Sequence, residues 1–282
     1  MIARRVVHTP PRIGAVIRGV LLAVLLLYTL LPVVWMVGTS LKTRALILST
    51  TPVLLFQPDL TAYQQFLSPG KSSIVLNLVN SLSTALASTA VTIVLGSLAA
   101  YGFSRYRFPG QRALLLLMLA TRLLPPLTAV LPLFLLLNSW SLIDTRAGLI
   151  LIYTGLAVPL ATWMMKAFID GIPVEYEEAA MIDGASRLRV LGQITLPLAA
   201  PGVVAVAILT FVLAWNDFLF AFIFTSVNAR TMPVLLSQTV GELDISWQTL
   251  ASLATIVIVP PIVLSLAGQK SLVRGLVGGG LK

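Results

Sequence analysis

The feature that most constrains this chain is a series of long apolar stretches that are almost free of charge. A transmembrane helix needs about 20 mostly apolar residues. Six stretches can supply one, and only two of them contain a charged residue, Arg122 in the third and Asp217 in the fifth. They are residues 19–41, 72–104, 113–137, 147–165, 203–224 and 245–269. The sequence therefore predicts an all-α integral membrane protein with six transmembrane helices.

The composition excludes water-soluble classes of protein. Only 10% of the 282 residues are charged, against roughly 25% in soluble domains, and the mean hydropathy is +0.96. So few charges cannot cover a soluble surface, which argues against a soluble enzyme, a secreted binding domain and a disordered protein. The absence of cysteine excludes disulfides and thiolate metal sites. The single histidine, His8, lies in a basic tail, and we expect no metal site.

Basic residues fix the orientation, because cytoplasmic loops are enriched in Lys and Arg. With the N-terminus inside, thirteen of the 19 basic residues lie on cytoplasmic segments, five lie on outer loops, and Arg122 lies within the membrane. Both termini are therefore expected in the cytoplasm, and the long first helix is expected to be an uncleaved anchor. The expected parts are a basic cytoplasmic tail (1–18), a first helix (19–41), an outer loop (42–71), a five-helix transmembrane domain (72–269) that includes a cytoplasmic loop (171–202), and a cytoplasmic C-terminal tail (270–282).

The cytoplasmic loop has the pattern of two short helices joined by a glycine turn. Pro173 suits a first helical position, and the glutamates that follow it suit the positive end of a helix dipole. Gly184 can end this helix in the left-handed conformation. Ser186 can cap a second helix that runs to about residue 195 and that Pro197 stops. The alternative is a solvated connecting loop without a function of its own.

A spaced motif in this loop favours a functional interpretation. Glu178-Ala179-Ala180 is followed after three residues by Gly184 and after nine more by Ile194-x-Leu196-Pro197. This resembles the EAA motif of bacterial ATP-binding-cassette (ABC) importer permeases. Further agreement lies in Asn80-Ser81, in Ala99-Ala100-Tyr101 with Arg105, in Ala214 to Phe218 and in Gln269 to Leu276. Together these stretches resemble the second, six-helix permease subunit of maltose-type carbohydrate importers over nearly the whole chain. The ending Gly278 to Lys282 departs from that family by its extra glycines.

The resemblance implies a type I ABC importer permease fold and a set of partners. These would be a second, related permease, two ABC ATPase subunits that bind ATP and Mg, an extracytoplasmic solute-binding protein or lipoprotein, a sugar-like substrate and the bilayer of a bacterial cytoplasmic membrane, with no nucleic acid. The chain itself would be non-catalytic and without a cofactor. The residues implied in coupling to the ATPase are Glu178, Ala179, Ala180, Asp183, Gly184, Ile194, Leu196 and Pro197.

Polar residues within the spans are the candidates for a translocation path. A charge in the bilayer usually faces a partner or a cavity, so Arg122 and Asp217 either pair with each other or line the passage. Trp215 and Asn216 offer an aromatic face and an amide to a sugar, and Asn80 serves either the passage or helix packing. Prolines 125, 126 and 132 predict a kinked or discontinuous third span that borders the passage.

Rival functions explain less of the sequence. Gly70-Lys71-Ser72 resembles the end of a phosphate loop, but residue 65 is Gln where that loop needs Gly. An intramembrane protease lacks its second carboxylate. A secondary transporter usually shows inverted repeats or several intramembrane charges and leaves the EAA motif unexplained. The substrate stays open among a disaccharide, an amino sugar, a glycerol phosphate derivative and other small solutes.

Overall fold

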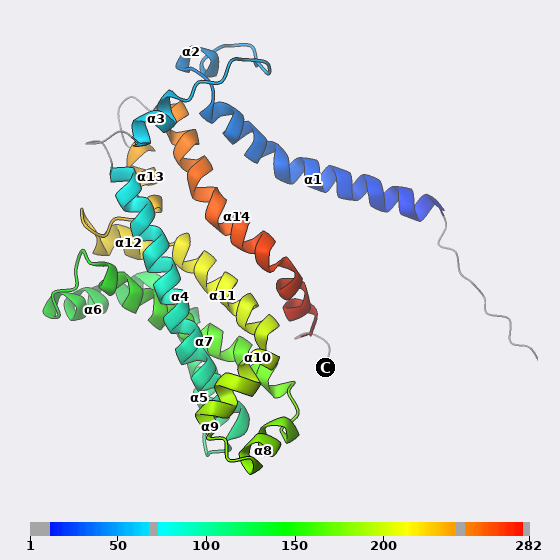
Figure 1. Ribbon diagram of the computed structural model, residues 1–282. Helices are drawn as coiled ribbons and strands as arrows, with labels where there is room; N and C mark the ends of the chain where they lie inside the picture. The colour runs from blue at the N-terminus through cyan, green and yellow to red at the C-terminus, as the bar shows by residue number, and fades with distance from the viewer. Residues whose placement is uncertain (1–11, 68–72, 241–245, 279–282) are drawn as a thin grey trace, which may run out of the picture. The chain divides into compact units, whose positions relative to one another are not determined.

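The computed structural model describes residues 12–67, 73–240 and 246–278, and all regular structure in these ranges is helical (Figure 1). The chain divides into two compact units, which are Met1–Gln65 with Leu243–Thr255, and Phe66–Glu242 with Ile256–Lys282. Expectations for the N-terminal tail before residue 12, for Lys71 and for the glycine-rich end lie outside the described residues.

The first unit contains α1 (Arg12–Ser40), α2 (Arg44–Ile47), most of α3 (Thr61–Leu67) and the first turns of α14 (Trp247–Gly278). Hydrogen bonds join its parts at the end of α1, where the Tyr63 hydroxyl donates to Ser40 Oγ at 2.7 Å and Ser252 Oγ donates to the Ser40 carbonyl at 3.3 Å. Lys42 Nζ lies 5.1 Å from the ring centroids of both Trp35 and Phe56. These cation–π contacts hold the segment after α1 against the helix end.

The second unit is built on α4 (Ser73–Arg105), α7 (Arg146–Asp170) and α11 (Ala200–Trp215), which pack against one another (Figure 1). Small residues allow the close approach, as is usual between membrane helices. A Cβ added at Gly96 on α4 would lie 3.0 Å from Ala161 Cβ on α7. Near the cytoplasmic end, a buried apolar cluster joins Ala100, Met165 and Val206 from the three helices.

The third span is broken, as its prolines predict. It consists of α5 (Gln111–Ala120), a 3₁₀ turn η1 (Thr121–Leu123) and α6 (Pro126–Ser139), and the axis bends by 97° between its two arms. Leu124 and Pro125 are extended between the arms. Each of them precedes a proline, and the helical conformation is sterically disfavoured for a residue in that position. The bend places Arg122 in the 3₁₀ turn.

The prediction of one continuous helix over residues 203–224 is wrong. The chain leaves the helix at Asn216 and resumes as α12 (Leu219–Phe224), and α13 (Met232–Val240) follows it. Asp217 explains the restart, since its Oδ1 accepts hydrogen bonds from the backbone N–H groups of Phe220 and Ala221. A carboxylate placed before a helix start in this way satisfies N–H groups that have no partner within the helix.

The number of spans agrees with the six predicted transmembrane helices. Four helices are long and apolar enough to cross a bilayer, and up to six spans result if each of two bent helix pairs is counted as one. The four are Gly14–Ser40, Ile74–Arg105, Arg146–Asp170 and Trp247–Gln269. The second bent pair consists of Arg187–Leu198, which belongs to the predicted cytoplasmic loop, and Ala200–Trp215, which is α11, and the axis turns by 84° between them.

Candidate functional site

The loop between α7 and α11 forms two short helical segments around a glycine turn. The first is α8 (Glu175–Ile182), and the second runs through α9 (Arg187–Val190), the π-helical turn η2 (Leu191–Thr195) and α10 (Leu196–Leu198). Gly184 has φ +86°, and the N–H of Ala185 reaches back to the Ala180 carbonyl. This is the glycine C-cap that the sequence predicts. Ser186 caps α9 by accepting a hydrogen bond from Arg189 N, also as predicted.

Two details of the predicted loop are wrong. The helix α8 begins at Glu175, two residues after Pro173. Pro197 does not stop the second segment, which continues to Leu198 and breaks at Ala199. The π-helical turn ends at Thr195, and Pro197 is the second residue of α10, in a first turn where the missing N–H of a proline is tolerated.

One side of the loop is exposed and mixes carboxylates with apolar side chains. Glu178, Ala179 and Asp183 are exposed. Tyr176, Ile182 and Leu188 beside them are 59%, 86% and 72% exposed. A cluster of exposed apolar side chains on a polar loop outside the membrane is typical of a protein-binding surface. Of the other predicted coupling residues, Ala180, Ile194 and Leu196 are half-buried, and Leu196 packs against the cytoplasmic apolar cluster.

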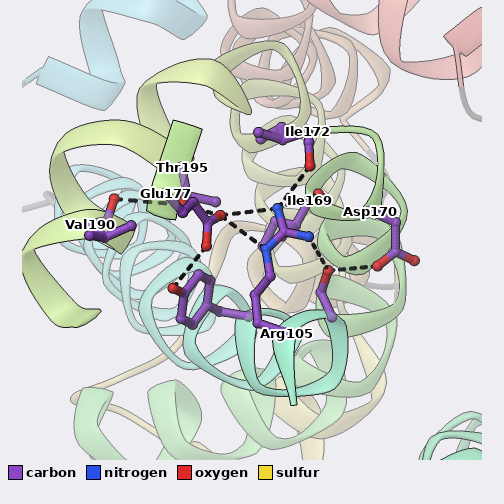
Figure 2. Close-up of polar contacts among 9 residues, drawn as sticks. Arg105, Ile169, Asp170, Ile172, Glu177, Val190 and Thr195 are labelled. Atoms are coloured by element: carbon purple, nitrogen blue, oxygen red, sulfur yellow. Dashed lines mark hydrogen bonds and ion pairs between the residues drawn. The ribbon is translucent and has the colours of Figure 1, made fainter. Parts of the chain in front are cut away.

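The opposite side of α8 is held by a buried ion pair. Glu177 is 1% exposed, and its Oε1 lies 3.0 Å from Arg105 at the end of α4 (Figure 2). The same carboxylate accepts hydrogen bonds from the Tyr101 hydroxyl at 3.0 Å and from Thr195 Oγ1 at 2.9 Å. Glu177 therefore joins α8 to α4 and to η2 with each of its oxygens in use, which is the condition under which a buried charge is tolerated.

Arg105 extends this network to α7. Its Nη2 donates to the carbonyls of Ile169 and Ile172, at 3.1 and 3.0 Å, and its Nη1 donates to Ser104 (Figure 2). The exposed pair of Lys166 and Asp170, 2.6 Å apart, lies beside it. Sequence reasoning did not select Glu177. The available signal was that Tyr101 and Arg105 are four residues apart and share a helix face, where a buried arginine requires an acidic partner.

A cavity of about 490 Å³ lies further into the second unit, between α4, η1, α6, α7 and α11. Its polar lining residues are Ser88, Thr89, Thr92, Thr121, Arg122, Thr128, Tyr153, Thr210 and Asp217. No ion pair joins Arg122 to Asp217, although both belong to the described part of the chain. Sequence analysis left two alternatives for Arg122 and Asp217, an ion pair or a place along the passage. Both residues line the cavity, and they do not form an ion pair with each other.

The other three candidates for the translocation path lie elsewhere. Trp215 is 1% exposed, its ring stacks on Phe211, and its Nε1 donates to the Val257 carbonyl at 3.0 Å. Asn80 is fully buried, and its Nδ2 donates to the carbonyls of Asn228 and Arg230, both at 2.9 Å. Neither residue lines the cavity, and neither does the exposed Asn216. The geometry therefore favours the packing alternative for Asn80 and a structural role for Trp215.

Asn80 belongs to a second polar network, at the other end of α7. Its Oδ1 accepts a hydrogen bond from Arg146 Nε at 2.7 Å. Asp144, two residues earlier, accepts hydrogen bonds from four successive backbone N–H groups, those of residues 226 to 229. Partial burial acts to raise the pKa of Asp144, but these N–H groups outweigh it and hold the pKa well below its usual range. The turn after α12 is thereby fixed against the start of α7.

In the described ranges, no three His, Asp or Glu side chains gather in a way that could hold a metal ion.

Comparison with known proteins decides the family. Residues 92–277 match the family described as the binding-protein-dependent transport system inner membrane component. The chain belongs to this family. Among its relatives, the sulfoquinovosyl glycerol transport system permease protein SmoH of Agrobacterium fabrum is 38% identical over 272 residues, which are 95% of this chain and 94% of SmoH. The trehalose transport system permease protein SugB of Mycobacterium tuberculosis is 36% identical over 259 residues, 90% of this chain and 93% of SugB.

A solved structure supports the fold of this permease. A chain of a bacterial ABC transporter involved in the import of the acidic polysaccharide alginate is similar with a TM-score of 0.78, at 20% identity, over 96% of this permease and 99% of that chain. The predicted ABC importer permease fold is therefore confirmed. This permease is a multi-pass component of the cytoplasmic membrane and a subunit of an ABC transporter.

Proposed function

We propose that this permease subunit moves a sugar or a sugar derivative into the cell by alternating access, driven by ATP hydrolysis in a separate subunit. The observation that carries the proposal is the two-sided loop helix α8, with one face exposed for a partner and the other face held by the buried Arg105–Glu177 pair. The relatives SmoH and SugB, named for sulfoquinovosyl glycerol and trehalose transport, support a sugar-type substrate.

The partners follow from the family and from the exposed face of α8. Two ABC ATPase subunits, which bind ATP and Mg, receive α8 through Glu178, Ala179 and Asp183. A second, related permease completes the passage, and an extracytoplasmic solute-binding protein delivers the substrate. Both termini then lie in the cytoplasm, and this chain performs no catalysis itself.

The contacts of α8 suggest how motion of an ATPase reaches the membrane. The loop is covalently continuous with α7 and α11, and the Arg105–Glu177 pair adds α4 as a third connection. A displacement of α8 therefore acts on three packed helices together. Since packed helices shift as rigid bodies more readily than they deform, the expected response is rotation of this helix group between inward-facing and outward-facing states.

The test is ATP-driven uptake by the whole transporter in proteoliposomes, with Ala179→Trp as the variant and Ala113→Trp as the matched control. Both alanines are exposed, but Ala113 lies on α5 and outside the α8 face. We expect Ala179→Trp to leave expression intact and to lower uptake by about tenfold or more, a loss of at least ~1.4 kcal/mol in coupling. Ala113→Trp should behave as the parent does. Wild-type uptake by Ala179→Trp would refute the proposal.

A further inference from the structure

The cavity in the second unit contains an arginine without a counterion. Arg122 lies on η1, and its guanidinium makes no ion pair or hydrogen bond within the described part of the chain. A lone cation within a membrane span is unfavourable, and such residues normally face a partner or a water-filled path. Arg122 is exposed and lines the cavity, which has a volume typical of ligand sites.

Asp217, the acidic residue that lines the cavity, already has other partners. Asp217 Oδ1 accepts three hydrogen bonds, from the Tyr153 hydroxyl at 3.1 Å and from the N–H groups of Phe220 and Ala221 at 3.0 and 3.2 Å. These donors stabilise the carboxylate without Arg122. The Arg122 guanidinium is thus the charged group of the cavity without a partner in the described part of the chain. Its five N–H donors can bind an anion.

Two threonine residues on α4 that border the cavity have buried hydroxyls without a hydrogen-bond partner. Thr89 and Thr92 line the cavity and are 8% and 0% exposed, and neither hydroxyl has a hydrogen-bond partner. By contrast, Thr210 in the same cavity donates to the Val206 carbonyl at 2.8 Å. Leaving a buried hydroxyl without a hydrogen-bond partner is unfavourable, so a small side-chain shift that brings Thr89 or Thr92 to a ligand hydroxyl gives each of them the partner that the protein itself does not supply.

We infer that this cavity is a binding site for an acidic sugar within this permease subunit. Arg122 binds the carboxylate, sulfonate or phosphate group, because a guanidinium matches such oxyanions with two parallel hydrogen bonds. Thr89 and Thr92 bind ring hydroxyls, and the second oxygen of Asp217 accepts from another. The inference rests on the proposed function and adds to it the class of substrate and the residues that select it.

The experiment measures binding of two probes, sodium D-glucuronate and D-glucose, to the purified whole transporter at matched ionic strength, by the rise in the melting temperature with probe concentration. The variants are Arg122→Gln, Arg122→Lys and, as a matched control, Arg112→Gln on the same helical arm. We expect glucuronate to raise the melting temperature of both the parent and the Arg112→Gln control. Glucose should have little effect on either. Arg122→Gln should weaken glucuronate binding by about tenfold or more, and Arg122→Lys should restore part of it.

Thr92→Val separates binding from folding. The valine removes a hydroxyl that has no partner, so the melting temperature without probe should stay equal or rise, while glucuronate binding should weaken several-fold. Equal binding of the two probes by the parent would overturn the inference, and so would unchanged glucuronate binding in Arg122→Gln. Loss of subunit assembly in Arg122→Gln would also overturn it, because Arg122 would then pair with an acidic residue of the second permease. Each leaves the Ala179→Trp result untouched, so failure here is distinguishable from failure of the proposed function.

Discussion

Two adjacent glutamates in α8 have opposite environments. Glu177 is 1% exposed and holds Arg105, whereas Glu178 is exposed on the face with Ala179. The EAA motif identified Glu178 from the sequence. It could not identify Glu177, because the burial of that residue depends on where the ends of α4 and η2 lie in space.

This difference predicts distinct effects for Glu177→Gln and Glu178→Gln. Glu177→Gln leaves Arg105 charged and buried without its partner, and breaking a buried pair from one side costs about 3–5 kcal/mol. We expect a clearly lower melting temperature of the detergent-solubilised transporter, measured by tryptophan fluorescence. Glu178→Gln should keep the melting temperature of the parent, because its side chain is exposed.

A double variant tests the physical reason. Removing both charges, as Glu177→Gln with Arg105→Gln, should destabilise the protein by less than the sum of the two single changes, since no unpaired charge remains. Additive losses, or equal melting temperatures for the two glutamate variants, would show that the ion pair does not hold α8.

At the scale of elements, the regular spans and the proline break in the third span follow from the sequence, whereas the break in the fifth span does not. The predicted helix 72–104 agrees closely with α4, Ser73–Arg105, because a span ends where its charges begin. The break at Asn216 was missed, since a carboxylate that satisfies backbone N–H groups reads in the sequence as an isolated intramembrane charge. Pro197 was misread because it lies in the first turn of α10, where a proline is tolerated.

The packing of α11 against α7 gives a prediction at this scale. A Cβ at Gly202 would lie 2.3 Å from Cγ of the Phe168 ring, an overlap that requires the ring or one of the two helices to shift. Gly202→Ala should therefore destabilise the transporter by about 1–3 kcal/mol, the usual range for overpacking. The control is Gly102→Ala on α4, where an added Cβ meets nothing within 4 Å. Thermal unfolding of both variants checks this, and equal stability would mean that α7 and α11 are not held this closely.

At the scale of the whole molecule, sequence reasoning selected the exposed face of α8 as a unit, but it selected Arg122 and Asp217 only as single residues and not the cavity that they share. The α8 face is local in sequence, so a spaced motif predicts it. The cavity draws on α4, η1, α6, α7 and α11, so only the fold brings Thr92, Arg122 and Asp217 to one place. Asn80 and Trp215 were candidates because polar and aromatic residues in a span attract a functional interpretation. Their actual partners are backbone carbonyls far away in sequence.

The orientation of the molecule can be tested by cysteine labelling, which is free of background because the sequence has no cysteine. The helix α7 has 25 residues, about 38 Å at 1.5 Å per residue, which exceeds the hydrocarbon core of about 30 Å. The two ends of α7 therefore lie on opposite sides of the membrane. Asp144 ties the turn that contains Val227 to the first end, and α8 follows the second.

We expect an impermeant maleimide to label Val227→Cys in intact cells and to label Glu175→Cys only after the membrane is permeabilised. Both positions are exposed, so access to the reagent rather than burial decides the result. Labelling of Glu175→Cys in intact cells would place α8 outside. It would then remove α8 from the reach of any cytoplasmic ATPase, whereas reversed labelling of both sites would invert the whole chain.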